Sequence, residues 1–144
     1  MTTIQKFEDL RSWKSARELV KMIYEITNDG AFHRDFGLRD QICRAAVSVM
    51  SNIAEGFGSG SDAEFIRFLG YSRRSISETQ SQLYIALDVN YLAQEQFEAI
   101  YTKANETERQ INAFIGYLSK SKRSKIRDEE TPYTIEHPDD ISDF

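Results

Sequence analysis

Cysteine, proline and histidine are scarce in this 144-residue sequence, and each shortage excludes a class of structure or site. The single cysteine, Cys43, can form no internal disulfide, so a reducing cytoplasm is the expected compartment. Both prolines, Pro132 and Pro138, lie near the C-terminus, which leaves the first 131 residues without this helix breaker. Neither His33 nor His137 has the Glu-x-x-His spacing of di-iron bundles, so no metal site is expected.

Long apolar runs, strand signals and catalytic motifs are also missing. No stretch approaches the roughly 20 apolar residues that span a bilayer, and the N-terminus lacks the apolar segment of a secretory signal. Period-two alternation and Asn-Gly or Asp-Gly turns are absent, so no β-hairpin is predicted. Gly56, Gly58 and Gly60 form a G-x-G-x-G run without the lysine of a phosphate-binding loop. We therefore expect a non-catalytic protein with no cofactor, small-molecule substrate or membrane partner.

Acidic residues outnumber basic ones, but unevenly along the chain. The formal net charge is -5, and residues 121–144, with four basic and seven acidic side chains, carry -3 of it. Residues 1–120 are therefore close to neutral, which argues against a surface covered by nucleic acid but is compatible with a local basic patch. Because residues 121–144 are charged, hold both prolines and lack periodicity, we interpret them as a disordered tail on a domain of residues 1–120.

Apolar residues at helical spacing are abundant in the sequence. Four segments show this pattern, at about residues 9–28, 38–57, 62–91 and 93–119, and short loops join them. Four amphipathic helices with short connections predict an all-α fold, an antiparallel up-down-up-down four-helix bundle.

Individual side chains mark the expected ends and faces of these helices. Asp9 is predicted to cap the first helix and Ser61 or Asp62 the third. Phe32 and Phe36 are predicted to plug the end of the bundle at the first loop. The second segment has two adjoining apolar stripes, which indicates burial against more than one neighbour. The stripes are Leu38, Ile42, Ala45, Ala46, Val49 and Ile53, and Cys43, Val47, Met50, Ala54 and Phe57.

A polar row follows one face of the second predicted helix, made of Arg44, Ser48, Asn52 and Glu55. In an antiparallel hairpin, the residue numbers of facing positions add up to a near-constant value. Glu55 with Arg67 and Arg44 with Glu78 both give 122, which predicts two ion pairs that fix the register of the second and third helices. The same register places Asn52 opposite Gly70. The alternative is that part of the row faces a neighbouring subunit or a ligand.

With this row the sequence resembles a known family. Residues 41–56, QICRAAVSVMSNIAEG, together with residues 65–69 and 7–10, are similar to the four-helix-bundle family of 23S ribosomal RNA intervening-sequence proteins. The similarity covers residues 7 to about 119 and leaves out the tail. The chain departs from the family pattern at Ser72-Arg73-Arg74-Ser75, where an Ala-x-Gly-Ser segment is usual.

The resemblance implies a bundle that assembles into a homopentameric ring. The chain also resembles the accessory proteins of diversity-generating retroelements, which are basic pentamers that bind reverse transcriptase. This likeness implies RNA or a nucleic-acid-processing protein as a partner. The candidate nucleic-acid contacts are Lys14, Arg17 and Lys21 at three-four spacing on the first helix, and Arg67, Arg73 and Arg74 on the third.

Two functions stay open at this point. The first is a nucleic-acid-associated homo-oligomer, in which symmetry multiplies each small basic patch. The second is a protein-binding scaffold with no role in nucleic-acid binding, which a sequence pI near 5.1 favours. Glu18 and Glu25 dilute the basic row of the first helix, as on an ordinary solvated face. A basic stripe on the surface would favour the first function, and a continuous apolar groove would favour the second.

Overall fold

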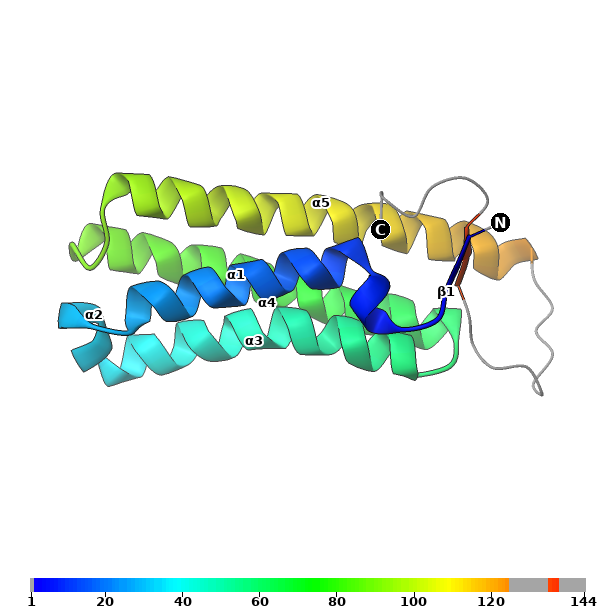
Figure 1. Cartoon of the computed structure of the whole chain (residues 1–144), viewed down its shortest axis with the longest axis horizontal. Helices are drawn as coiled ribbons and strands as arrows, with labels where there is room; N and C mark the ends of the chain where they lie inside the picture. Colours follow the sequence, from blue (N-terminus) through cyan, green and yellow to red (C-terminus); the bar gives the residue numbers. More distant parts are fainter. Residues whose placement is uncertain (1, 125–134, 138–144) are drawn as a thin grey trace.

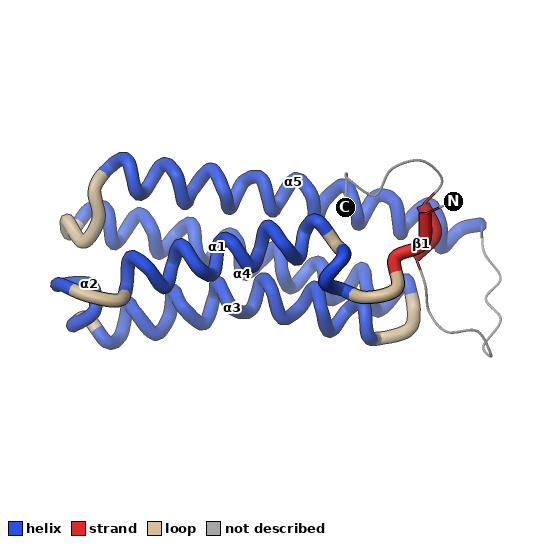
Figure 2. Tube along the Cα trace, viewed as in Figure 1, coloured by secondary structure: helices blue, strands red, loops and turns tan. Residues whose placement is uncertain are grey.

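The structure, a computed structural model, describes residues 2–124 and 135–137. Four long helices lie side by side along the length of the molecule, each antiparallel to the next (Figures 1 and 2). They are α1 (Arg11–Thr27), α3 (Phe36–Gly58), α4 (Asp62–Asp88) and α5 (Gln94–Ser124). Short elements flank them: the 3-10 helix η1 (Phe7–Asp9), α2 (Gly30–Arg34), and the strands β1 (Thr2–Ile4) and β2 (Ile135–His137).

The order of the helices around the bundle follows the chain. Helix α3 packs against α1 and α4, and α5 packs against α4 and α1, so that α1 lies diagonally across from α4. The predicted antiparallel four-helix bundle is therefore confirmed. No helix of the described residues has the length and apolar character needed to cross a membrane.

One apolar row from each helix meets along the axis of the bundle. Each large apolar side chain buried in this way stabilises the fold by roughly 1.5–3 kcal/mol relative to leaving it exposed. The fully buried members include Leu19 and Ile23 of α1, Ile42 and Ile53 of α3, Leu69, Ile76 and Leu83 of α4, and Ile111 and Phe114 of α5.

Capping side chains fix the starts of α3 and α4. The Ser61 side chain accepts a hydrogen bond from the Glu64 backbone N–H at 3.1 Å, which confirms the predicted cap of α4. The prediction for Asp9 is wrong, because Asp9 lies in η1 and α1 begins after Leu10 without a side-chain cap. Leu10 is fully buried, so burial of an apolar side chain determines where this helix begins.

The two phenylalanines at the first loop have different roles. Phe32 is buried in α2 and stacks on Tyr91 with ring centroids 5.1 Å apart, so it closes the end of the bundle as predicted. Phe36 does not, since 62% of it is exposed. Asp35 caps α3 by accepting from the Leu38 backbone N–H, which makes Phe36 the first residue of that helix. Its ring lies on the surface, 4.8 Å from the Arg39 guanidinium.

The register of α3 against α4 agrees with the sequence, but small polar side chains hold it. The facing pairs have residue numbers that add up to 121 or 123, close to the predicted 122. The Ser72 hydroxyl donates to the Val49 carbonyl at 2.7 Å, the Ser75 hydroxyl to the Ser48 hydroxyl at 2.9 Å, and the Gln82 amide to the Gln41 side chain at 3.4 Å.

The predicted ion pairs across this interface are not formed. Arg67 pairs with Glu64 of its own helix at 2.7 Å, and among the described residues Arg44 makes no ion pair with Glu78. Arg44, Glu55 and Glu78 are exposed, because the closely packed surfaces of α3 and α4 leave their long side chains on the outside. The Asn52 amide bonds to Ser48 within α3 at 2.8 and 2.9 Å instead of reaching Gly70.

The termini form a ribbon that the sequence did not predict. Strand β1 pairs antiparallel with β2, with Thr2 opposite His137 and Ile4 opposite Ile135. Three-residue strands are too short to show period-two alternation. Ile4 of β1 is buried and belongs to the hydrophobic core. Helix α5 also continues to Ser124, so residues 121–124 are helical, and residues 135–137 form β2. The rest of the predicted tail, residues 125–134 and 138–144, lies outside the described residues.

Alanine substitutions at two helical glycines are expected to change stability in opposite directions. A Cβ added at Gly56 would lie 2.9 Å from Phe65 Cδ1 and 2.9 Å from Phe68 Cβ, whereas one at Gly70 would have no atom within 4 Å. We expect Gly56→Ala to lower the free energy of unfolding by about 1–3 kcal/mol. Gly70→Ala, its matched control, should raise it by up to about 1 kcal/mol. Urea unfolding of both variants tests the pair, and equal shifts would contradict close packing at Gly56.

A second set of variants compares how much a buried interface serine and an exposed charged side chain contribute to stability. Ser72→Val places a larger side chain in the α3–α4 interface and should lower the free energy of unfolding by about 1–3 kcal/mol. Ser77→Val, at an exposed position of the same helix, should stay within about 0.5 kcal/mol of the parent, as should Arg44→Ala. Thermal and urea unfolding measure all three. A loss near 3 kcal/mol in Arg44→Ala would show that the guanidinium has a buried partner.

Candidate interaction surfaces

The described residues contain no group of three or more His, Cys, Asp and Glu side chains placed to hold a metal ion. Cys43 is half-buried on α3, and its sulfur lies 3.5 Å from the Thr27 hydroxyl of α1. The features that distinguish this molecule are therefore its surfaces: the predicted basic residues and an apolar seam.

The predicted basic residues do not form one patch. Lys14, Arg17 and Lys21 are exposed on α1, and Arg73 and Arg74 are exposed on α4. Because α1 and α4 are diagonal in the bundle, the structure places the two groups on different sides of the molecule. The described residues of one chain thus lack the continuous basic stripe that would favour nucleic-acid binding.

On α4, the arginines also differ from one another. Arg73 points toward α5, where its guanidinium donates to the Asn112 side chain at 3.1 Å. Arg67 and Arg74 instead flank Tyr71, with guanidinium carbons 5.8 and 5.7 Å from the ring centroid. We call Arg67, Tyr71 and Arg74 the α4 arginine–tyrosine cluster. Cation–π contacts of this kind hold the two guanidinium groups over the ring while leaving N–H donors free for an anion.

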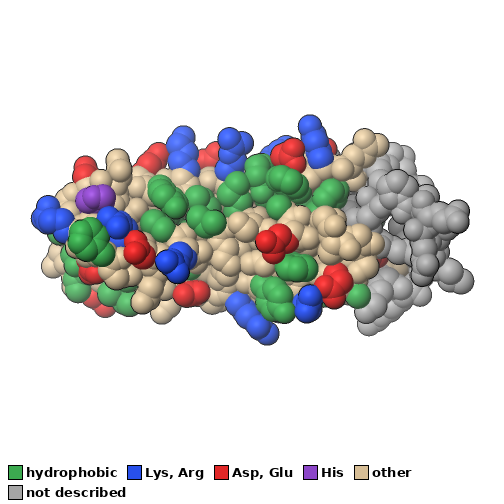
Figure 3. All heavy atoms as spheres, turned by 90° about the horizontal axis from the view of Figure 1, so that it is seen from below, with side chains coloured by type: hydrophobic (Ala, Val, Ile, Leu, Met, Phe, Trp, Pro, Cys, Tyr) green, Lys and Arg blue, Asp and Glu red, His purple; other side chains and the backbone are tan. Residues whose placement is uncertain are grey.

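An apolar seam runs along the outer surface between α1 and α3. Figure 3 shows this face, where hydrophobic side chains form a band along the molecule with charged side chains beside it. Tyr24 is 51% exposed and Val47 is 37% exposed, and half-buried neighbours extend the band. We define the α1–α3 seam by its apolar members, which are Val20, Tyr24, Cys43, Val47 and Met50.

Two shallow depressions lie along this seam and share Tyr24 as a wall. One, of about 520 Å³, has Cys43 and Val47 beside the polar groups of Asp40, Arg44 and Ser48. The other, of about 540 Å³, is formed by Val20 and Met50 with Arg17, Glu18 and Lys21. Apolar side chains in the middle with charged side chains at the margin are the arrangement found in protein–protein interfaces.

The seam contains much of the second apolar stripe predicted on α3. That stripe was expected to be buried against a neighbouring helix, but Cys43 and Met50 are only half-buried and Val47 is exposed. The reason is that α1 and α3 meet over their inner faces, so the outer part of the stripe has no helix to cover it. The predicted burial of this stripe against a second helix is therefore incomplete among the described residues.

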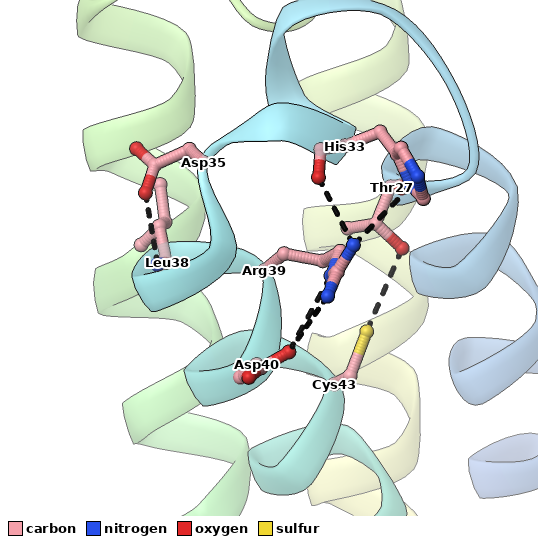
Figure 4. A network of polar contacts seen from close by, with 7 residues as sticks. All are labelled: Thr27, His33, Asp35, Leu38, Arg39, Asp40 and Cys43. Atoms are coloured by element: carbon pink, nitrogen blue, oxygen red, sulfur yellow. Dashed lines mark hydrogen bonds and ion pairs between the residues drawn. The ribbon is translucent and has the colours of Figure 1, made fainter.

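A network of polar contacts lies at the α2 end of the bundle, next to the α1–α3 seam (Figure 4). The Arg39 guanidinium donates to the His33 backbone carbonyl at 3.1 Å and pairs with Asp40 at 3.3 Å. A ring nitrogen of His33 lies 3.2 Å from the Thr27 carbonyl. These contacts join α2 to the end of α1 and the start of α3, and so fix Asp40 at the margin of the first depression.

The same end of the bundle is tied to the loop before α5. The Tyr91 hydroxyl donates to the Asp35 carboxylate at 2.8 Å. This hydrogen bond, together with burial and the negative charge of Asp35, raises the pKa of Tyr91 above its usual value. Because Asp35 also caps α3, one carboxylate fixes the start of this helix and its link to the opposite side of the bundle.

The polar contacts between α5 and its neighbours could not be predicted from the sequence. Ser15 of α1 and Thr107 lie 2.6 Å apart, oxygen to oxygen, in the buried interface. Gln80 donates to Asn105 at 2.8 Å across the α4–α5 interface. Such pairs join residues 25 and 92 positions apart, so local spacing gave no means to find them.

Comparison with known proteins agrees with this architecture. Residues 8–113 match the family described as 23S rRNA-intervening sequence protein. Among solved structures, the chain is similar to a protein of unknown function from the S23 ribosomal protein family of Bacteroides thetaiotaomicron VPI-5482. The two share 26% sequence identity with a TM-score of 0.62, over 72% of this chain and 94% of that chain. No match was found among curated proteins. Because the family match spans well over half of the sequence, the chain belongs to the 23S rRNA-intervening sequence protein family.

Proposed function

We propose that this protein is a non-catalytic cytoplasmic binding module that works as a homo-oligomer, and that its copies associate through the α1–α3 seam. The observation that carries the proposal is the continuous band of half-exposed apolar side chains along that seam. Of the two functions left open by the sequence, an apolar groove favours the one based on protein association.

Exposure of the seam to water would be unfavourable in a lone subunit. Burial of apolar surface stabilises by about 25 cal/mol per Å², and both Tyr24 and Val47 are exposed apolar side chains. Aromatic side chains at the centre of an interface often dominate its binding energy. The charged margin formed by Arg17, Lys21 and Arg44 would then set orientation more than affinity.

The form of the oligomer that we propose is a homopentameric ring. The resemblance to ring-forming proteins supports this number, and closed symmetry supports it in general, because homo-oligomers of soluble proteins mostly form closed point groups. A ring also repeats each surface of the subunit around one axis, so a weak contact made by one copy acts with multiplied avidity.

A charge in the seam tests the proposal. Val47→Glu places a carboxylate among apolar side chains and should weaken self-association by about tenfold or more, because burying an unpaired charge is costly. Mass in solution, measured by analytical ultracentrifugation across a concentration series, gives the result. Thr102→Glu is the control, an exposed site on α5, the helix diagonal to α3. A parent protein that is monomeric at micromolar concentration would contradict the proposal.

The α4 arginine–tyrosine cluster supports a second candidate function, association with single-stranded RNA. The name of the matched family refers to 23S rRNA. Tyr71 between two guanidinium groups offers a ring on which a base can stack and cations for the neighbouring phosphates. The cluster is small, and Glu64 already pairs with Arg67, so binding by one subunit would be weak and sensitive to salt.

Paired variants test the RNA function with matched charge. Arg67→Ala with Arg74→Ala should reduce affinity for a single-stranded RNA about tenfold at low salt, by loss of phosphate and stacking contacts. Lys14→Ala with Lys21→Ala removes the same charge from α1 and should change affinity much less. Fluorescence anisotropy over a salt series measures both. Equal losses would show a general charge effect, and no binding by the parent protein at low salt would exclude this function.

A further inference from the structure

The C-terminal end of α4 carries an apolar projection that the bundle does not use. Ile85 is 48% exposed and Val89 is 50% exposed, one helical turn apart. The carboxylates of Glu78 and Asp88 lie on the same outer part of the helix, and both residues are exposed. We call these four residues the α4 knob. An exposed apolar pair beside acidic side chains is a second candidate contact surface, on a different helix from the α1–α3 seam.

The knob has the size and spacing of a helix that fits a groove. Its members lie at positions 78, 85, 88 and 89, separated by seven, three or four residues, so they share one helical face. From Glu78 to Val89 the helix rises about 16 Å. With its charged margin, the seam on α3 extends from Asp40 to Met50, a rise of about 15 Å, of which the apolar part from Cys43 to Met50 is about 10 Å. The two surfaces therefore match in length.

The charges of the two surfaces are complementary. The seam has three cations at its margin, Arg17, Lys21 and Arg44, against two acidic residues, Glu18 and Asp40. The knob has two carboxylates, and the nearest cation on its face is Arg74, one turn before Glu78. A seam facing another seam would place two margins of net charge +1 against each other, whereas a seam facing a knob pairs that margin with two carboxylates.

We propose that the α4 knob of one copy docks into the α1–α3 seam of the next copy, so that the chains associate head to tail. The inference rests on the proposed self-association and adds which surface fills the seam. Ile85 and Val89 would occupy the depressions on either side of Tyr24, with Glu78 and Asp88 facing the basic margin. Such an interface is heterologous, since each copy contributes two different surfaces, and it closes into a ring when the rotation between copies permits.

Two interface variants and their mixture test the head-to-tail arrangement. Val47→Glu blocks the seam, and Ile85→Lys replaces an apolar knob residue with a cation that faces the basic margin. Each variant alone should be monomeric at concentrations where the parent assembles. Each retains one intact surface, so an equimolar mixture should form a 1:1 complex, which native mass spectrometry identifies from the masses of the two variants. Circular dichroism melts confirm that both variants are folded.

The outcomes separate this inference from the proposal on which it rests. If Val47→Glu is monomeric but Ile85→Lys still assembles like the parent, the seam mediates association with a different surface, and the head-to-tail inference is overturned while self-association stands. The same conclusion follows if both variants are monomeric but their mixture forms no heteromeric complex. If the parent itself is monomeric, both proposals fail. Thr102→Glu, which changes neither surface, should assemble like the parent and mix with it freely.

Discussion

Close packing of α3 against α4 is the constraint on which the rest of this bundle depends. Gly56 leaves room for the rings of Phe65 and Phe68, and Ser72 and Ser75 bond directly to the facing helix. Small side chains let the two backbones approach, and the hydrogen bonds fix their register. Once this pair is set, α1 and α5 complete the core from the other side, and long charged side chains can lie only on the outside.

That constraint determines what the surface presents. Because the inner faces of α1 and α3 are used by the core, the outer part of the wide apolar arc of α3 stays half-exposed beside Tyr24. At the end of α4, Ile85 and Val89 are also exposed, because no other helix of the described residues covers them. The head-to-tail association proposed above would use both of these apolar surfaces. Apolar burial would supply the affinity, and the charged residues would set the orientation.

Charge distribution bears on the two functional hypotheses more than composition does. The basic residues of α1 and α4 lie on diagonal helices, and each group has acidic neighbours, so the described part of one chain presents no strong positive field. The α4 arginine–tyrosine cluster is a local exception, where Tyr71 orders two guanidinium groups. RNA association would therefore depend on repetition of this small cluster in an assembly, whereas self-association depends on a surface that each subunit already has.

The sequence by itself determined the four helices, their antiparallel order, the register of α3 on α4 and the cap at Ser61, because helical periodicity and capping are local properties. Only the tertiary structure decided which part of each apolar stripe is covered and which polar residues meet. Arg44 and Glu78 had the right spacing but lie outside a tightly packed interface. Phe36 lies on the surface because Asp35 caps α3 and the helix begins at Phe36, two residues before the predicted start. Packing distance and the position of a third helix are non-local, and residue spacing does not encode them.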